Sequence, residues 1–248
     1  AAMAAAHAHK LWQTVIDFAD ALHDAWFARG RFSQARIGLS WAYESALSQE
    51  DLQAVANFLL LRGRASIKQS DYEFAKDMLT QSLRLFENEL ADKSGIVAVK
   101  YELAEIAAEQ ANFQEARKLL ETCFLICKEH QTGNINIADV LYKWAGVEYA
   151  QGTTTEEDQS AKQKLLEAWQ IYEAEGNEEG MIRTLRKLAT IATTSEKDFV
   201  QAQNYIENAL QICTNLADKR EHGLLLYNLA GVNLYSHLHT KTNSLDQA

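Results

Sequence analysis

Proline is absent from this 248-residue chain, so the residue that most strongly interrupts a helix occurs nowhere. Glycine occurs only 11 times. Together these scarcities favour long, uninterrupted α-helices. No stretch reaches the roughly 18 apolar residues of a membrane span, and residues 1–10 have no basic segment followed by an apolar core. We therefore expect neither a membrane-spanning helix nor a signal peptide.

Cysteine is also scarce. Its three residues are an odd number in a chain too long to need disulfides, which is typical of reduced thiols in a cytoplasmic protein. Cys123 and Cys127 stand four residues apart, but a zinc site would need further ligands close by. We expect both to be buried as small apolar side chains, and we predict no metal site and no cofactor.

Positive charge is in deficit, because the formal net charge is −10. Proteins that bind nucleic acids usually present basic patches that release counterions from the phosphate backbone. Direct binding of DNA or RNA is therefore not expected. The hydrophobic share of 47% is enough to bury a continuous seam between helices.

What the chain does contain is an internal repeat. Five alanines recur at intervals of 40, 41, 45 and 41 residues: Ala35, Ala75, Ala116, Ala161 and Ala202. An aliphatic residue follows each alanine after four positions and a small residue after three more, which marks one face of an α-helix. The aliphatic residues are Leu39, Leu79, Leu120, Leu165 and Ile206, and the small residues are Ala42, Ser82, Cys123, Ala168 and Ala209. A period of about 40 residues predicts stacked two-helix units.

A second set of small residues precedes the alanines and predicts where the first helix of each pair packs closely. These inner small residues are Gly63, Ala104, Ala145, Ala189 and Ala230, with His23 in the first unit. First helices are predicted at about residues 10–28, 51–69, 95–110, 136–151, 178–194 and 221–237, and second helices at about 32–48, 72–91, 113–130, 157–175 and 199–217. The expected fold is an all-α, right-handed solenoid of 11 helices in about 5.5 antiparallel pairs.

The predicted array occupies residues 10–248, in units of about 10–50, 51–92, 93–134, 135–176 and 177–218 with a partial unit at 219–248. Residues 1–9 are expected to be an extension outside it, part of which could be vector-derived. The turn at 152–160 is about four residues longer than its equivalents and predicts a longer exposed loop, whose acidic run at 156–158 suits a helix start. The last helix is predicted to end near His237. Residues 244–248 resemble the start of another second helix, with Ala248 in the place of the five alanines, which predicts that further repeats follow.

The turns carry a family resemblance. Residues 30–35 (GRFSQA), 70–75 (SDYEFA) and 111–116 (ANFQEA) each join a turn residue, an aromatic residue and one of the five alanines. This pattern resembles the tetratricopeptide repeat (TPR), which implies a protein-interaction array. The period is about 41 rather than 34 residues and the common closing proline is missing. Such longer units are similar to the sensor arrays of STAND-type signalling ATPases and of bacterial transcriptional regulators, although this chain has no GxxxxGK[ST] phosphate loop.

In TPR arrays the first helices line the concave surface, so the resemblance selects the side chains that point inward. Tyrosine or arginine, the residues that dominate binding hot spots, occupies four of six equivalent positions. The candidate groove residues are Tyr101, Tyr142, Tyr149, Arg186, Tyr227, Arg64 and Glu105. The same stripe includes Asp20, Leu60, Gly146, Thr190, Thr193, Gly231 and Leu234, and its glycines would leave room above the tyrosines. The alternative is that each tyrosine half-buries its ring against the next helix, with the hydroxyl in water.

Catalytic signatures such as HExxH, GxSxG and CxxC are missing. Glu102, Glu105 and Glu109 lie along one helix, where solvated carboxylates are ordinary. The pairs at residues 7 and 9 and at 237 and 239 are two histidines each, too few for a zinc site. We therefore expect no enzyme.

The expected function is a scaffold that binds a protein or peptide, with no direct nucleic-acid or membrane partner, as the ligand-sensing segment of a larger signalling protein. Two alternatives stay open. One is a self-association or structural module, with the isolated chain monomeric or homodimeric, and the other is the regulatory segment of a transcription regulator.

Overall fold

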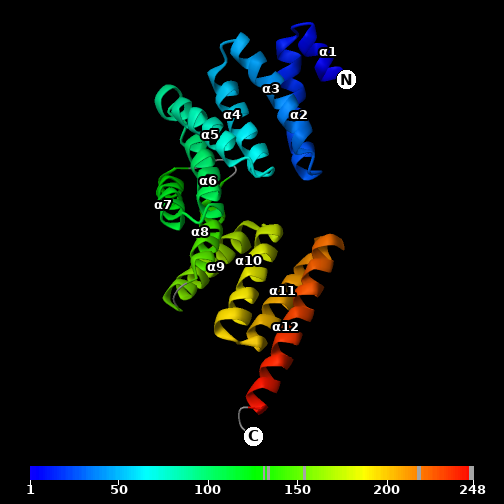
Figure 1. Cartoon of the computed structure of the whole chain (residues 1–248), viewed down its shortest axis with the longest axis vertical. Coiled ribbons are helices and arrows are strands. Elements are labelled where there is room, and N and C mark those ends of the chain that lie inside the picture. Colours follow the sequence, from blue (N-terminus) through cyan, green and yellow to red (C-terminus); the bar gives the residue numbers. More distant parts are fainter. Residues whose placement is uncertain (131, 133–134, 153–154, 217–218, 246–248) are drawn as a thin grey trace. The chain divides into compact units, whose positions relative to one another are not determined.

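The computed structural model describes residues 1–130, 132, 135–152, 155–216 and 219–245. Every regular element in these residues is helical, as predicted. The elements are α1 (Ala2–Ala8), α2 (Trp12–Ala28), α3 (Phe32–Ser48), α4 (Leu52–Ile67), α5 (Tyr72–Arg84), the π-helical turn η1 (Leu85–Glu89), α6 (Lys93–Glu109), α7 (Phe113–Glu129), α8 (Ile137–Gln151), α9 (Thr155–Glu175), α10 (Glu178–Ile191), the π-helical turn η2 (Ala192–Glu196), α11 (Phe199–Leu216) and α12 (Lys219–Leu245). They form two compact units, Ala1–Ile135 and Asn136–Ala248. Within each unit, helices that follow one another along the chain pack together as pairs (Figure 1).

The repeat face predicted from the five alanines is confirmed. Ala35, Ala75, Ala116, Ala161 and Ala202 are each 0% exposed. The aliphatic and small residues that follow them on the same face are buried as well. Because a side chain larger than alanine has no space at these positions, the second helix of each pair packs closely against its neighbours.

The turns inside the pairs end the first helices by backbone geometry. Gly30, Ser70 and Ala111 adopt left-handed backbone conformations with φ of 65°, 59° and 58°. At the second of these turns, Ser70 N–H donates to the carbonyl of Ile67 (2.9 Å) and Asp71 N–H to that of Ser66 (3.0 Å). This pattern is the Schellman motif, which ends a helix by satisfying its last carbonyls.

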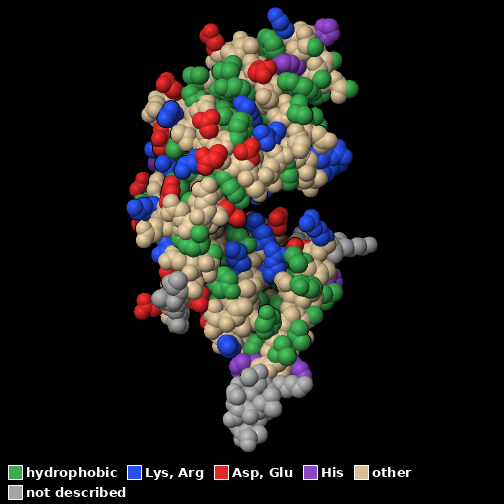
Figure 2. Space-filling view, viewed as in Figure 1, with side chains coloured by type: hydrophobic (Ala, Val, Ile, Leu, Met, Phe, Trp, Pro, Cys, Tyr) green, Lys and Arg blue, Asp and Glu red, His purple; other side chains and the backbone are tan. Residues whose placement is uncertain are grey.

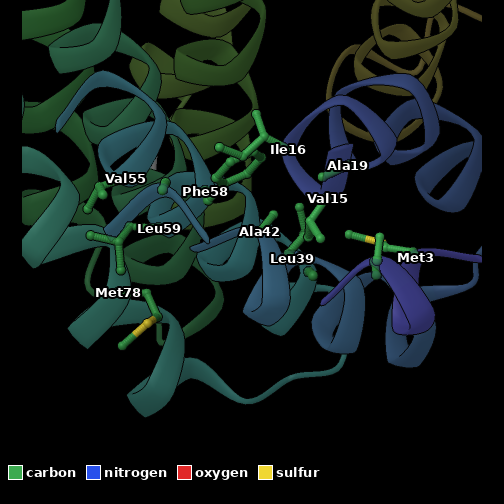
Figure 3. Close-up of a cluster of buried hydrophobic side chains, with 14 residues drawn as sticks. Met3, Val15, Ile16, Ala19, Leu39, Ala42, Val55, Phe58, Leu59 and Met78 are labelled. Carbon is green, nitrogen blue, oxygen red and sulfur yellow. The ribbon is translucent and has the colours of Figure 1, made fainter. Parts of the chain in front are cut away.

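The core of the first unit includes the N-terminal segment. Met3 and Ala6 of α1 are 7% and 6% exposed and belong to the same apolar cluster as residues of α2, α3 and α4. Figure 3 shows Met3 beside Val15 and Leu39. Residues 1–9, predicted to be an extension of the array, thus contain a helix that packs on the core of the first unit. The alanine-rich composition favours this helix but gives no apolar periodicity from which to predict it.

Two boundaries in the second unit differ from the prediction. Helix α9 begins at Thr155, so the loop is shorter than expected and Glu156, Glu157 and Asp158 lie in the first helical turn, where negative charge is favourable. Helix α12 does not end near His237 but continues to Leu245, because no glycine or proline follows to stop it. Residues 244 and 245 thus extend this helix, and Ala248 lies outside the described residues.

Candidate functional site: a groove on α10 and α12

A groove of about 390 Å³ lies between α10 and α12 in the second unit. Six residues of the predicted inward stripe line it: Arg186 and Thr190 from α10, Thr193 from η2, and Tyr227, Gly231 and Leu234 from α12. Thr194, Asn228 and Tyr235 complete much of the wall. These residues, chosen by the helix phase derived from the alanines, thus lie around one groove.

Arg186 is held at this groove by an ion pair between the two helices. Its Nη1 donates to Oε1 of Glu221 on α12 at 2.6 Å, and both side chains are 27% exposed. A partly buried, charge-assisted hydrogen bond of this kind fixes the guanidinium more firmly than a surface contact would. Arg186 consequently presents a positioned cation and links α10 to α12.

The α12 wall of the groove is aromatic and aliphatic. Tyr227 is 75% exposed, and Leu234 and Tyr235 are each 58% exposed. Hydrophobic side chains are visible along this helix in Figure 2. On the opposite wall, the Thr190 hydroxyl donates to the carbonyl of Arg186 at 3.1 Å, and the Thr193 hydroxyl of η2 donates to the carbonyl of Ala189 at 2.7 Å. With those protons engaged, the groove offers mainly methyl groups and rings to a ligand.

Tyr142 and Tyr149 of α8 do not line the α10–α12 groove. Both are half-buried against the apolar cluster of Ala145, Leu165 and Leu188. Tyr142 packs under Arg183 and Lys187, and its burial raises its pKa. The hydroxyl of Tyr149 hydrogen-bonds to Oγ1 of Thr194 at 2.8 Å.

The remaining candidates lie in the first unit, where ion pairs engage most of them. Arg64 Nε donates to Oε1 of Glu102 at 2.9 Å, and Lys68 Nζ to Oε1 of Glu105 at 2.9 Å. Glu102 is only 5% exposed, so the expectation of a solvated carboxylate is wrong for this residue. Tyr101 is half-buried on the same helix.

A more polar hollow of about 420 Å³ in the first unit is lined by Asp20, Leu60 and Arg64, three further positions of the predicted stripe. Burial raises the pKa of Asp20, while nearby His23 opposes the shift. The carboxylate and guanidinium in its wall make it less suited than the α10–α12 groove to an apolar side chain.

Sequence reasoning missed a group of cations next to the groove. Lys and Arg side chains gather over α10 in Figure 2, although the chain as a whole is acidic. Lys187 is a half-buried lysine of α10, and burial lowers its pKa, with Arg186 and Lys143 lowering it further. Counting the charged residues at equivalent positions of the repeats would have revealed this group of cations, because no Asp or Glu residues stand between them in the sequence.

The cysteines take the structural role expected of them. Cys123 is 0% exposed and its thiol lies 3.7 Å from the carbonyl of Val97, while Cys127 accepts a hydrogen bond from the Thr132 hydroxyl at 3.1 Å. Within the described ranges, no group of three or more metal-ligating side chains comes together. None of the helices in those ranges is both long and apolar enough to cross a membrane.

Solved structures share this arrangement of helices at low sequence identity. BtubC (BKLC) from P. vanneervenii aligns with a TM-score of 0.69 and 17% identity, over 86% of this chain and 87% of that one. The TPR-like repeats of a kinesin light chain from Podospora anserina align with a TM-score of 0.59 and 17% identity, over 85% of this chain and 98% of that one. Pseudomonas aeruginosa PilF aligns with a TM-score of 0.60 and 13% identity, over 93% of this chain and 99% of that one. No family model and no curated protein sequence matches this chain. The chain therefore has a TPR-like fold of stacked helix pairs.

Proposed function

We propose that this chain is a protein-interaction scaffold and that its α10–α12 groove binds a peptide segment of a partner protein. The observation that carries the proposal is the convergence of six predicted inward positions on one groove. Exposed tyrosine side chains beside an ion-paired arginine have the composition of a binding hot spot. No chemical step is proposed for the chain itself.

The size and lining of the groove define the ligand further. A volume of about 390 Å³ suits a few side chains rather than a folded domain. Tyr227, Leu234 and Tyr235 would surround an apolar anchor, and Arg186 would bind a polar group beside it. The ligand we propose is a short segment with one or two large apolar residues.

The larger context is proposed from the repeat itself. The period of about 41 residues and the resemblance to STAND-type and transcription-regulator arrays support a regulatory or sensing segment of a cytoplasmic, bacterial signalling protein. In such a setting, binding of a peptide in the groove would report the presence of a partner to attached domains.

A matched pair of glycine substitutions in α12 tests the groove. No side-chain or distant backbone atom lies within 4 Å of a Cβ built on either Gly231 or Gly223, but only Gly231 lines the groove. Peptides selected from a phage-displayed random library should bind the parent and Gly223→Trp, and Gly231→Trp should abolish that binding. If the library yields no peptide, or if Gly231→Trp binds the selected peptides normally, the groove is not the binding site.

Self-association is the second candidate, and exposed leucines on α12 favour it. Leu224, Leu226 and Leu238 are 40%, 51% and 50% exposed. A second copy could cover these side chains and remove their apolar surface from water. Light scattering distinguishes the two functions: a monomer at all concentrations contradicts self-association, whereas a dimer that Leu226→Glu dissociates supports it.

A further inference from the structure

Lys187 on α10 is a half-buried cation in an unusual setting. Its Nζ lies 4.6 Å from the centre of the Tyr142 ring on α8. The charged groups that act on it are Arg186 on its own helix and Lys143 on α8, both positive. Arg183, one turn before it, also lies over the Tyr142 ring, at 5.4 Å. Among the described residues, no carboxylate forms an ion pair with Lys187.

This arrangement is costly for the folded chain. Burial removes water from the ammonium, and the two positive neighbours add repulsion, so each effect lowers the pKa of Lys187. The Tyr142 ring compensates only in part, because a cation–π contact contributes about 0.5–2 kcal/mol. Buried charges in proteins are normally paired.

Comparison with the first unit shows which group is missing. There, Arg64 follows the inner small residue Gly63 by one position, and Glu102 precedes the next one, Ala104, by two. These two positions form the ion pair of 2.9 Å. The first unit thus supplies both charges of the pair from its own chain.

The equivalent positions in the second unit hold no such pair. Gly146 follows Ala145 by one position, and Lys187 precedes Ala189 by two. Lys187 Nζ lies 2.5 Å from the point where a Cβ on Gly146 would stand, and no other residue comes within 4 Å of that point. Gly146 therefore has no side chain at the place that Arg64 occupies in the first unit, and the ammonium of Lys187 packs against its backbone instead.

We infer that Lys187, together with Gly146 and Tyr142, forms a receptor site for one carboxylate side chain of an acidic partner peptide. The charges favour a carboxylate over a phosphate dianion. Arg183 lies 3.8 Å from Asp139 and Arg186 lies 2.6 Å from Glu221, so each already has an acidic neighbour. Lys187 is left as a single cation to be neutralised, which suits a monoanion.

The site adjoins the groove through consecutive residues of α10. Arg186 lines the groove between α10 and α12, and Lys187 faces Tyr142 on α8. A peptide with its apolar anchor in the groove and an Asp or Glu side chain directed toward α8 would bring that carboxylate to Lys187. This inference rests on the proposed function and adds the acidic character of the ligand.

Selection from a random dodecapeptide phage library tests it. Peptides selected on the parent should carry Asp or Glu at a fixed distance from the apolar anchor, and those selected on Lys187→Met should not. Gly146→Ala should weaken the acidic preference, because the added methyl group displaces the ammonium. Gly223→Ala is the matched control and should keep the preference, since its methyl group contacts nothing.

Fluorescence anisotropy then measures the effect with one selected peptide and its Asn/Gln counterpart. The acidic peptide should bind the parent about tenfold more tightly than its counterpart, and Lys187→Met should remove that difference. Equal binding of the two peptides by the parent, or a preference that survives in Lys187→Met, overturns the inference. Peptides that lack acidic residues but still depend on the groove would refute the carboxylate site and leave the proposed function intact.

Discussion

Gly95 and Gly223 occupy similar places near the starts of α6 and α12, yet the structure predicts opposite responses to alanine. A Cβ on Gly95 would stand 2.3, 2.4 and 2.5 Å from three ring atoms of Phe86, whose side chain is fully buried. Nothing lies within 4 Å of a Cβ on Gly223. Gly180 resembles Gly95, because its Cβ would lie 2.5 Å from the ring of Tyr172.

The magnitude follows from two opposing terms. Overpacking a tight core costs about 1–3 kcal/mol, while replacing glycine by alanine in a helix gains about 0.5–1 kcal/mol. An aromatic ring held on all sides cannot turn away as a flexible side-chain end can, so the upper part of the first range applies at Gly95. We expect Gly95→Ala to lower the free energy of unfolding by about 1–2 kcal/mol. Gly223→Ala should raise it by about 0.5–1 kcal/mol.

Urea unfolding and hydrogen exchange together measure both effects. In a repeat array each unit is stabilised chiefly by its neighbours, so Gly95→Ala should reduce amide protection mainly in α5 and α6. Adding Phe86→Leu should recover part of the loss, because the smaller side chain makes room for the methyl group. A Gly95→Ala protein as stable as Gly223→Ala would refute the reasoning.

Three further predictions concern the backbone and the charges. Ala111→Gly should stabilise the chain by about 1 kcal/mol in thermal unfolding, because alanine is strained at φ of 58°; a lower melting temperature would contradict this. Arg64→Met should destabilise by about 1–3 kcal/mol because it leaves the Glu102 carboxylate buried without its partner, and adding Glu102→Gln should restore most of that in urea unfolding; no recovery would mean that charge is not the cause. The third prediction concerns pH. Between the lowered pKa of Lys187 in the folded chain and its ordinary value of 10.5, the unfolded chain binds more protons than the folded chain, so the free energy of unfolding of the parent should rise with pH. This holds below the pH at which Tyr142 titrates. Lys187→Met should lack this rise and be more stable at neutral pH, and identical pH profiles would contradict the lowered pKa.

The helix phases could be predicted from the sequence because each depends on spacing within one helix. Ala75 and Leu79 lie on the same face of their helix however the helices pack together, so the recurring pattern was enough to predict that both are buried. The same phase placed Arg186 and Tyr227 in one groove, since both positions are counted from an inner small residue.

Contacts between side chains of different helices could not be predicted in this way. The fit of Phe86 against Gly95 depends on how closely α6 approaches η1, and spacing along the chain does not give that distance. Likewise, Glu102 was expected to be solvated because carboxylates along a helix usually are, and it is instead buried and paired with Arg64 of α4. Helix α1 escaped prediction because its alanines carry no apolar periodicity.

The two units differ in one respect that bears on where a partner would bind. Both use the same pair of positions on successive first helices, but the first unit fills them with Arg64 and Glu102 while the second has Gly146 and Lys187. A ligand carboxylate at Arg64 would have to displace Glu102, whose burial makes release into water costly. At Lys187 the ligand displaces no carboxylate of the chain, and it neutralises a charge that the Tyr142 ring compensates only in part. Equivalent positions in one array can thus serve stability in one unit and recognition in another, which is why we place the partner on the second unit.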